Sequence, residues 1–176
     1  IRIAPETKDL LRRAAERQHA SLSQFIVGAA LERAASLLAD EGRYPEAISA
    51  TRAALGLLRQ SGGDRNALGV DIWLALGGLY GAIGDGRESE ASYRQALEIA
   101  LTRFGPNHPA STAVQQPLGG LLLDAGELEE AQRLLQTAHD RLVARFGPEH
   151  PDVAASWQQL GRLAWEQGQP AQADLA

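Results

Sequence analysis

The side chains that could support chemistry here are imidazoles and carboxylates, since the sequence has four histidines and no cysteine. His108 and His150 occupy the same place in a hexapeptide that recurs 42 residues later, so a structural role in a repeated loop explains them better than metal binding. No phosphate loop, dinucleotide fingerprint, helical zinc pair or serine elbow is present. The carboxylates show no matched acid and base pair. The sequence therefore predicts no enzyme, no metal and no cofactor.

Basic side chains suggest a different chemistry. Residues 1–38 carry six basic and four acidic groups, about +2, whereas the whole chain is −5 and the remainder about −7. A weakly basic start on an acidic body favours a local nucleic-acid contact, with ordinary solvated helix faces as the alternative. No apolar run approaches the roughly 18 residues of a membrane span. We expect no membrane partner and, from the absence of cysteine, a cytoplasmic location. The start without methionine suggests that residues are missing upstream.

The basic segment is expected to form one short strand and two helices. In a strand, Ile1 and Ile3 would lie on one face and Arg2 on the other. Pro5 suits the first turn of a helix that extends to about residue 18. Ser21 begins a capping box that opens a second helix. Because chains below about 40 residues seldom fold alone, we expect this segment to pair with a second copy of itself.

This order, with Pro5 after the strand and the capped second helix, resembles a ribbon-helix-helix domain, most closely that of antitoxins that accompany acetyltransferase toxins. The resemblance implies a dimer whose paired strands enter the DNA major groove. It places Arg2 at base edges and Ser21 and Ser23 at phosphate, with Lys8 as a further DNA contact. Ala4 departs from the family, because it lacks the hydroxyl that would cap the first helix. The expected dimer core consists of Ile1, Ile3, Leu11, Leu22, Phe25 and Ile26.

A strict repeat of 42 residues occupies the rest of the chain. Glycines recur at 42, 84, 126 and 168, and small residues recur in phase at 35, 77, 119 and 161. Further small residues keep the period at 47, 89, 131 and 173 and at 54, 96 and 138. Small side chains at fixed points allow helices to cross closely, and a glycine suits the turn between them. Each unit is therefore predicted to be a helix pair.

The repeat resembles tetratricopeptide (TPR) repeats in the form found in kinesin light chains, as in Leu76-Gly77 and Ala96-Leu97. The resemblance implies an α-solenoid whose concave face binds a protein or peptide. We expect Trp73 and Trp157 in the core, and a helix containing Pro117 that starts late or is kinked. Trp165 would serve as an anchor if exposed. The expected partner-binding residues are Leu74, Gly78, Gln116, Gln158, Arg162 and Trp165.

The two patterns share one helix, residues 21–39, which we predict to be continuous. The chain is thus expected to be mainly α, with a dimeric ribbon-helix-helix domain at 1–38 and a TPR array at 31–176. Its units are about 31–69, 70–111, 112–153 and an incomplete 154–176. This organisation favours a homodimeric regulator that binds operator DNA and a protein partner, for which a toxin is one candidate. The alternative is a dimeric TPR adaptor in which the first domain serves only dimerisation.

Overall fold

The computed structural model describes residues 9, 13, 33, 35–60 and 65–168. Asp9, Arg13 and Arg33 are helical and exposed, and residues 35–40 form the end of a helix. The predicted strand at residues 1–3 and most of the predicted helix at 21–39 lie outside the described residues. The chain divides into unit 1, Ile1–Arg103, and unit 2, Phe104–Ala176.

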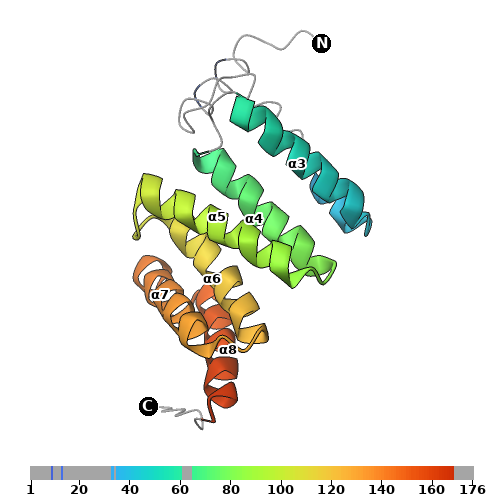
Figure 1. Ribbon diagram of the computed structural model, residues 1–176. Coiled ribbons are helices and arrows are strands. Elements are labelled where there is room, and N and C mark those ends of the chain that lie inside the picture. The colour runs from blue at the N-terminus through green and yellow to red at the C-terminus, as the bar shows by residue number, and fades with distance from the viewer. Residues whose placement is uncertain (1–8, 10–12, 14–32, 34, 61–64, 169–176) are drawn as a thin grey trace. The chain divides into compact units, whose positions relative to one another are not determined.

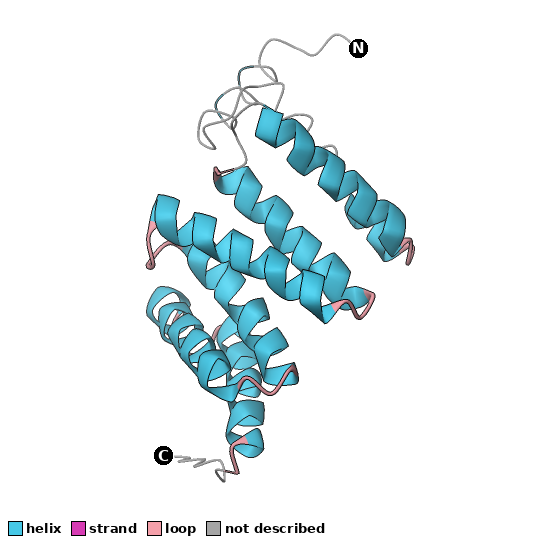
Figure 2. Cartoon of the chain, in the orientation of Figure 1, coloured by secondary structure: helices cyan, strands magenta, loops and turns pink. Residues whose placement is uncertain are grey.

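The described parts of both units are helices joined by short loops, without a strand (Figures 1 and 2). The main helices of unit 1 are α3 (Tyr44–Gln60), α4 (Ala67–Ala82) and α5 (Gly86–Phe104), whose last residue already belongs to unit 2. Those of unit 2 are α6 (Pro109–Asp124), α7 (Leu128–Phe146) and α8 (Pro151–Glu166). The chain is mainly α and forms TPR-type helix pairs.

The helix boundaries follow the sequence period. α3, α5 and α7 begin at residues 44, 86 and 128, and α4, α6 and α8 begin at 67, 109 and 151, each 42 residues apart. Gly84 and Gly126 lie just beyond α4 and α6 with φ of 78° and 81°. At each helix end, the N–H of the glycine and the N–H of the next residue both donate to carbonyls of the last turn. The second of these bonds runs from Asp85 to the Tyr80 carbonyl at 2.9 Å, and from Glu127 to the Leu122 carbonyl at 2.8 Å. These are Schellman ends, which need a left-handed residue that glycine adopts without strain.

The core of unit 1 lies between α3 and α4 and continues to α5. Leu55 and Leu58 of α3 pack with Leu68, Ile72 and Leu76 of α4, and each is at least 96% buried. Trp73 and Leu79 pack against this cluster from its margin. The prediction that Trp73 contributes to the core is therefore confirmed.

Small residues control how closely α4 and α5 approach. A Cβ built on Gly77 would lie 2.4 Å from the Tyr93 ring. Beside it, the Ser89 hydroxyl donates a 2.7 Å hydrogen bond to the Gly77 carbonyl. Ala96, one turn beyond Tyr93, is fully buried. The in-phase small residues thus mark the helix crossing, as the repeat predicts.

In unit 2, α6 and α7 make the same crossing. A Cβ on Gly119 would lie 2.8 Å from the Leu135 side chain, and Ala131 and Ala138 are fully buried. α6 begins at Pro109 and runs through Pro117 to Asp124, so the helix does not start late. Pro117 removes one backbone hydrogen bond without ending the helix.

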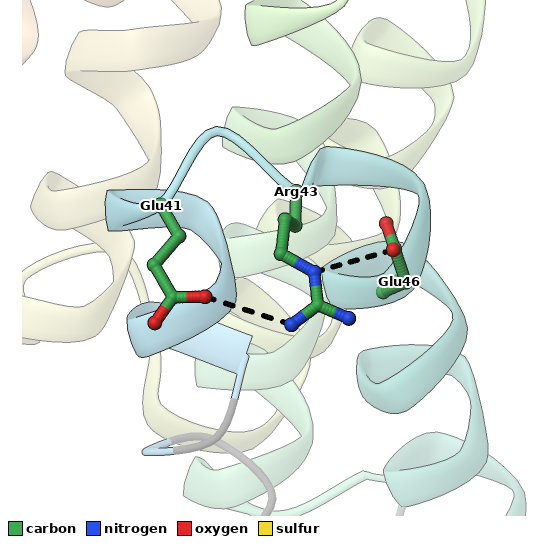
Figure 3. A network of polar contacts seen from close by, with 3 residues as sticks. All are labelled: Glu41, Arg43 and Glu46. Carbon is green, nitrogen blue, oxygen red and sulfur yellow. Dashed lines mark hydrogen bonds and ion pairs between the residues drawn. The ribbon is translucent and has the colours of Figure 1, made fainter.

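The turn before α3 carries an exposed polar cluster (Figure 3). The Arg43 guanidinium lies 3.6 Å from a Glu41 carboxylate oxygen and 3.3 Å from one of Glu46. All three side chains are about half exposed or more. Exposed pairs of this kind contribute roughly 0–1 kcal/mol, so this cluster orders the turn without dominating stability.

Candidate partner-binding cavities

Unit 1 contains an apolar cavity of about 380 Å³ on one face of α4. The helical residues Ala35 and Ala39 line it from one side, and Ala75, Gly78 and Ala82 of α4 from another. Of the predicted partner-binding residues, Gly78 lines the cavity and is exposed, and Leu74 beside Ala75 is half-buried. A Cβ on Gly78 would have its nearest neighbour, the Tyr93 hydroxyl, at 3.7 Å, which leaves the backbone accessible.

The cavity has little polar chemistry to offer. None of the described residues that line it carries a charged side chain. The Thr51 hydroxyl, one of its few polar groups, donates a 2.8 Å hydrogen bond to the carbonyl oxygen of Ala47. Tyr44 also lines the cavity and is half-buried. The cavity therefore suits an apolar side chain of a partner, because burial of apolar surface is the main free energy it can supply.

Unit 2 contains a larger and more polar cavity of about 710 Å³ between α6, α7 and the start of α8. Gln116, a predicted partner-binding residue, lines it. Arg141 donates a 2.9 Å hydrogen bond to the Gln115 side-chain oxygen, which fixes its guanidinium. Arg145 lies over the Phe146 ring at 4.8 Å from the centroid. Since Asp152 also lines the cavity, it suits a polar peptide segment better than an apolar one.

The other predicted partner-binding residues lie on α8, and none of them lines the two cavities. Gln158 is exposed. Arg162 is exposed and bonded to Asp124 at the end of α6. Trp165 is 80% exposed, which meets the condition set for an anchor. The neighbouring Gln159 side chain covers Gly120, with its amide nitrogen 2.8 Å from a Cβ built there.

Trp157 does not occupy the core, so that prediction is wrong. Its side chain is 59% exposed. It lies against the edge of the buried His139 ring, with centroids 4.3 Å apart and planes at 60°. α7 lies beside Trp157 as α3 lies beside the equivalent Trp73, but α4 is followed by α5, whereas no described helix follows α8. The position is therefore covered only where a further helix follows the pair.

The described histidines have structural partners. The Ala110 and Asp152 N–H groups donate 3.2 Å hydrogen bonds to Nδ1 of His108 and His150, so each imidazole caps the next helix. Their rings stack on Phe104 and Phe146 at 4.7 and 4.4 Å. The predicted structural role is confirmed, and the recurring hexapeptide is a helix-capping loop.

His139 serves a different structural purpose between α7 and α8. Its Nδ1 lies 2.8 Å from the Ser156 hydroxyl, which itself donates to the Val153 carbonyl at 2.7 Å. Because that hydroxyl has one proton, Nδ1 must carry the hydrogen of the first bond. Within the described ranges no three metal-ligating side chains come together. No helix in those same ranges is long and apolar enough to cross a membrane.

The residues expected to contact DNA lie outside the described part of the chain. The expected DNA contacts are Arg2, Lys8, Ser21 and Ser23. The residues of the expected dimer core also lie outside the described part, namely Ile1, Ile3, Leu11, Leu22, Phe25 and Ile26.

Sequence reasoning missed the cavity residues on the second helix of each pair. Thr51 and Ala54 of α3 and Arg141 and Arg145 of α7 line the two cavities, although only first-helix residues were expected there. The 42-residue period predicts that these residues belong to a helix pair. It does not predict which side of the pair packs loosely enough to leave a cavity.

The helix pairs, their 42-residue register and their open cavities define a TPR protein. A tetratricopeptide repeat family model matches residues 70–141 and 110–175, and the chain belongs to this family. A second model, described as antitoxin TacA 1-like, matches residues 1–59. The start of the chain is thus similar to an antitoxin, and its continuation is a TPR array.

Solved structures with the same fold come from kinesin-light-chain-like proteins. One contains nearly identical TPR-like repeats from a Podosopora anserina protein described as a kinesin light chain, with a TM-score of 0.74 and 21% identity, covering 80% of this chain and 67% of that one. Another is BtubC (BKLC) from P. vanneervenii, with a TM-score of 0.73 and 22% identity, covering 92% of this chain and 63% of that one. The chain spans about two thirds of the length of these proteins. No curated protein sequence matches it.

Proposed function

We propose that the chain is a homodimeric, sequence-specific DNA-binding regulator, not an enzyme, whose TPR arm binds a protein or peptide. The observation that carries the proposal is the antitoxin-like match over residues 1–59, joined to a TPR array over residues 70–175. The basic balance of residues 1–38 within a chain of net charge −5 supports a DNA contact at that end. Transcriptional repression in the cytoplasm follows as the expected activity.

A repressor role is favoured over toxin neutralisation by the packing of α3. The antitoxin-like match reaches residue 59, almost the end of α3. Ile48, Leu55 and Leu58 on this helix are buried in the core cluster with α4. The apolar face of the matched helix is therefore used inside the arm, and a toxin would have to bind elsewhere, for which the apolar cavity is the best candidate surface.

The test is binding of the full chain to duplex DNA. Randomised 30-base-pair duplexes would be selected for binding, and the affinity of the selected duplex measured by fluorescence anisotropy across a salt series. We expect affinity to fall linearly on logarithmic axes as salt rises, because phosphate contacts release counterions. Arg2→Ala should relax base preference, whereas Lys8→Ala should weaken all duplexes alike and reduce the salt slope by about one.

Arg133→Ala provides the control, since Arg133 is an exposed residue of α7 in the acidic arm. This variant should bind duplex DNA like the parent chain. Sedimentation of the same samples gives the oligomeric state. A dimer that retains no duplex at low salt would overturn the DNA-binding proposal and favour the adaptor, in which the first domain serves only dimerisation.

A further inference from the structure

Unit 1 has a second cavity, of about 310 Å³, on another face of α4 from the apolar cavity. Its walls include Trp73, Leu76 and Tyr80 of α4 and Leu55 of α3. We call it the α4 aromatic cavity. Its volume lies at the small end of the range of about 300–1,000 Å³ that is usual for ligand sites. Because a water molecule takes about 30 Å³ of the liquid, the cavity has room for about ten non-hydrogen atoms.

Tyr80 gives this cavity an unused hydrogen-bond donor. The residue is 6% exposed, and within the part of the chain that the structure describes its hydroxyl has no hydrogen-bond partner. Buried hydroxyls without a partner are rare in proteins. The unmet hydroxyl therefore points to an acceptor that is supplied from outside the chain.

Only exposed side chains separate this hydroxyl from solvent. The Arg52 guanidinium lies over the Tyr80 ring, 5.5 Å from its centroid. Arg52 is 4.0 Å from Glu88, at the outer limit of an ion pair, and the two side chains are 62% and 50% exposed. Because such an exposed pair is weak, Arg52 can turn away and let a ligand reach the hydroxyl.

The charges around the hydroxyl favour a neutral ligand. Burial raises the pKa of the Tyr80 hydroxyl, the Arg52 charge opposes this rise, and Glu88 and Asp85 add to it. One positive and two negative charges thus act on the hydroxyl, which leaves no positive excess to hold an anion. Arg59 also lines the cavity but is already engaged with other groups. A cation would be repelled by Arg52, and a charged ligand would lose more hydration than a neutral one.

We propose that the α4 aromatic cavity binds a neutral small molecule in which a carbonyl group is attached to an apolar body. The Tyr80 hydroxyl donates to the carbonyl oxygen. Trp73, Leu55 and Leu76 contact the apolar body, whose burial supplies most of the affinity. This cavity and the apolar cavity lie on different faces of α4, so a small ligand and a protein partner can bind unit 1 together.

The test titrates the full chain with three probes of nearly the same shape and follows the ¹⁵N spectrum. Acetophenone carries the neutral carbonyl, α-methylstyrene replaces its oxygen with a methylene group, and benzoate carries a negative charge. We expect acetophenone to shift the Trp73 indole N–H signal with a Kd of about 1 mM or below. At equal submillimolar concentrations the other two probes should bind at least about fivefold more weakly, since α-methylstyrene accepts no hydrogen bond and benzoate meets Glu88 and Asp85.

Variants locate the site. Tyr80→Phe should bind acetophenone and α-methylstyrene equally, because the donor that distinguishes them is gone. Tyr44→Phe makes the same chemical change in the apolar cavity and should bind all three probes like the parent. Tyr80→Phe should also melt no lower than the parent, since its hydroxyl has no partner among the described residues.

Three results would overturn the proposal. The first is that acetophenone does not bind. The second is that α-methylstyrene or benzoate binds as tightly as acetophenone. The third is that Tyr80→Phe keeps the preference of the parent for acetophenone over α-methylstyrene.

Discussion

Gly77 of α4 lies so close to Tyr93 of α5 that a Cβ on Gly77 would be 2.4 Å from two carbons of the tyrosine ring. The Tyr93 ring thus occupies the space that a side chain at residue 77 would need. The Ser89 hydroxyl bonds to the carbonyl of the same glycine at 2.7 Å. One residue without a side chain therefore sets both the packing and the polar contact of this helix pair.

Gly77→Ala should destabilise unit 1 by about 1–3 kcal/mol, because the added methyl group forces the ring or the helix to move. Gly78→Ala is the matched control: its Cβ would meet only an ordinary contact at 3.7 Å. Since alanine favours the helix by roughly 0.5–1 kcal/mol over glycine, this control should be neutral or stabilised. Urea unfolding followed by circular dichroism measures both. Equal midpoints for the two variants would refute the close-packing argument.

Gly126→Ala should lower the stability of unit 2 by about 1–2 kcal/mol because of the backbone conformation, although there is room for the added methyl group. A Cβ at Gly126 would meet nothing within 4 Å, but its φ of 81° is left-handed. Gly126→Asn should cost less, because asparagine tolerates this conformation better than alanine. Gly161→Ala, in the open interior of α8, should be stabilised or unchanged. Thermal unfolding ranks the three variants, and an alanine no worse than asparagine at 126 would contradict the conformational explanation.

The repeat could be recognised from the sequence because the same residue types recur every 42 residues. Glycines at 42, 84, 126 and 168 all adopt positive φ, between 67° and 81°. The in-phase alanines 47 and 131 are fully buried, and so are alanines 96 and 138, which keep the same period. A 42-residue period fixes which residues face a neighbouring helix, so the fold class and the helix crossings could be predicted.

The cavities could not be predicted in the same way. A cavity depends on how far apart two neighbouring helices lie at the positions that line it. Thr51 of α3 and Ala75 of α4 are such positions in unit 1, and Gln116 of α6 and Arg145 of α7 are such positions in unit 2. Trp157 illustrates the same limit. It has the repeat position of Trp73, but exposure depends on whether another helix covers that position, which a period does not encode.

His150→Ala should destabilise unit 2 by about 0.5–2 kcal/mol, the usual cost of losing a helix cap. His150 Nδ1 accepts the Asp152 N–H at 3.2 Å, and its ring stacks on Phe146 at 4.4 Å. His150→Asn restores an acceptor at the cap without the stacked ring, so it should recover part of the loss. Urea unfolding separates the two contributions. An asparagine variant as unstable as the alanine variant would assign the effect to stacking.

Stability should fall above about pH 10 because two tyrosines are buried in unit 1. Burial raises the pKa of Tyr93 above its ordinary 10.0, although its hydrogen bond with Ser89 opposes the shift. Burial likewise raises the pKa of Tyr80, against the Arg52 charge. The folded chain thus holds these protons more tightly than the unfolded chain, so stability is complete below the unfolded value and is lost as pH rises toward the folded values.

Tyr93→Phe tests this alkaline dependence, because phenylalanine keeps the ring against Gly77 but has no proton to lose. Urea midpoints measured between pH 8 and about 11 should fall less steeply for Tyr93→Phe than for the parent, and less still when Tyr80→Phe is added. At pH 8 the single variant should lose no more than about 0.5–1.5 kcal/mol, the net worth of one hydrogen bond. Parallel curves for parent and double variant would show that the alkaline loss arises from other groups.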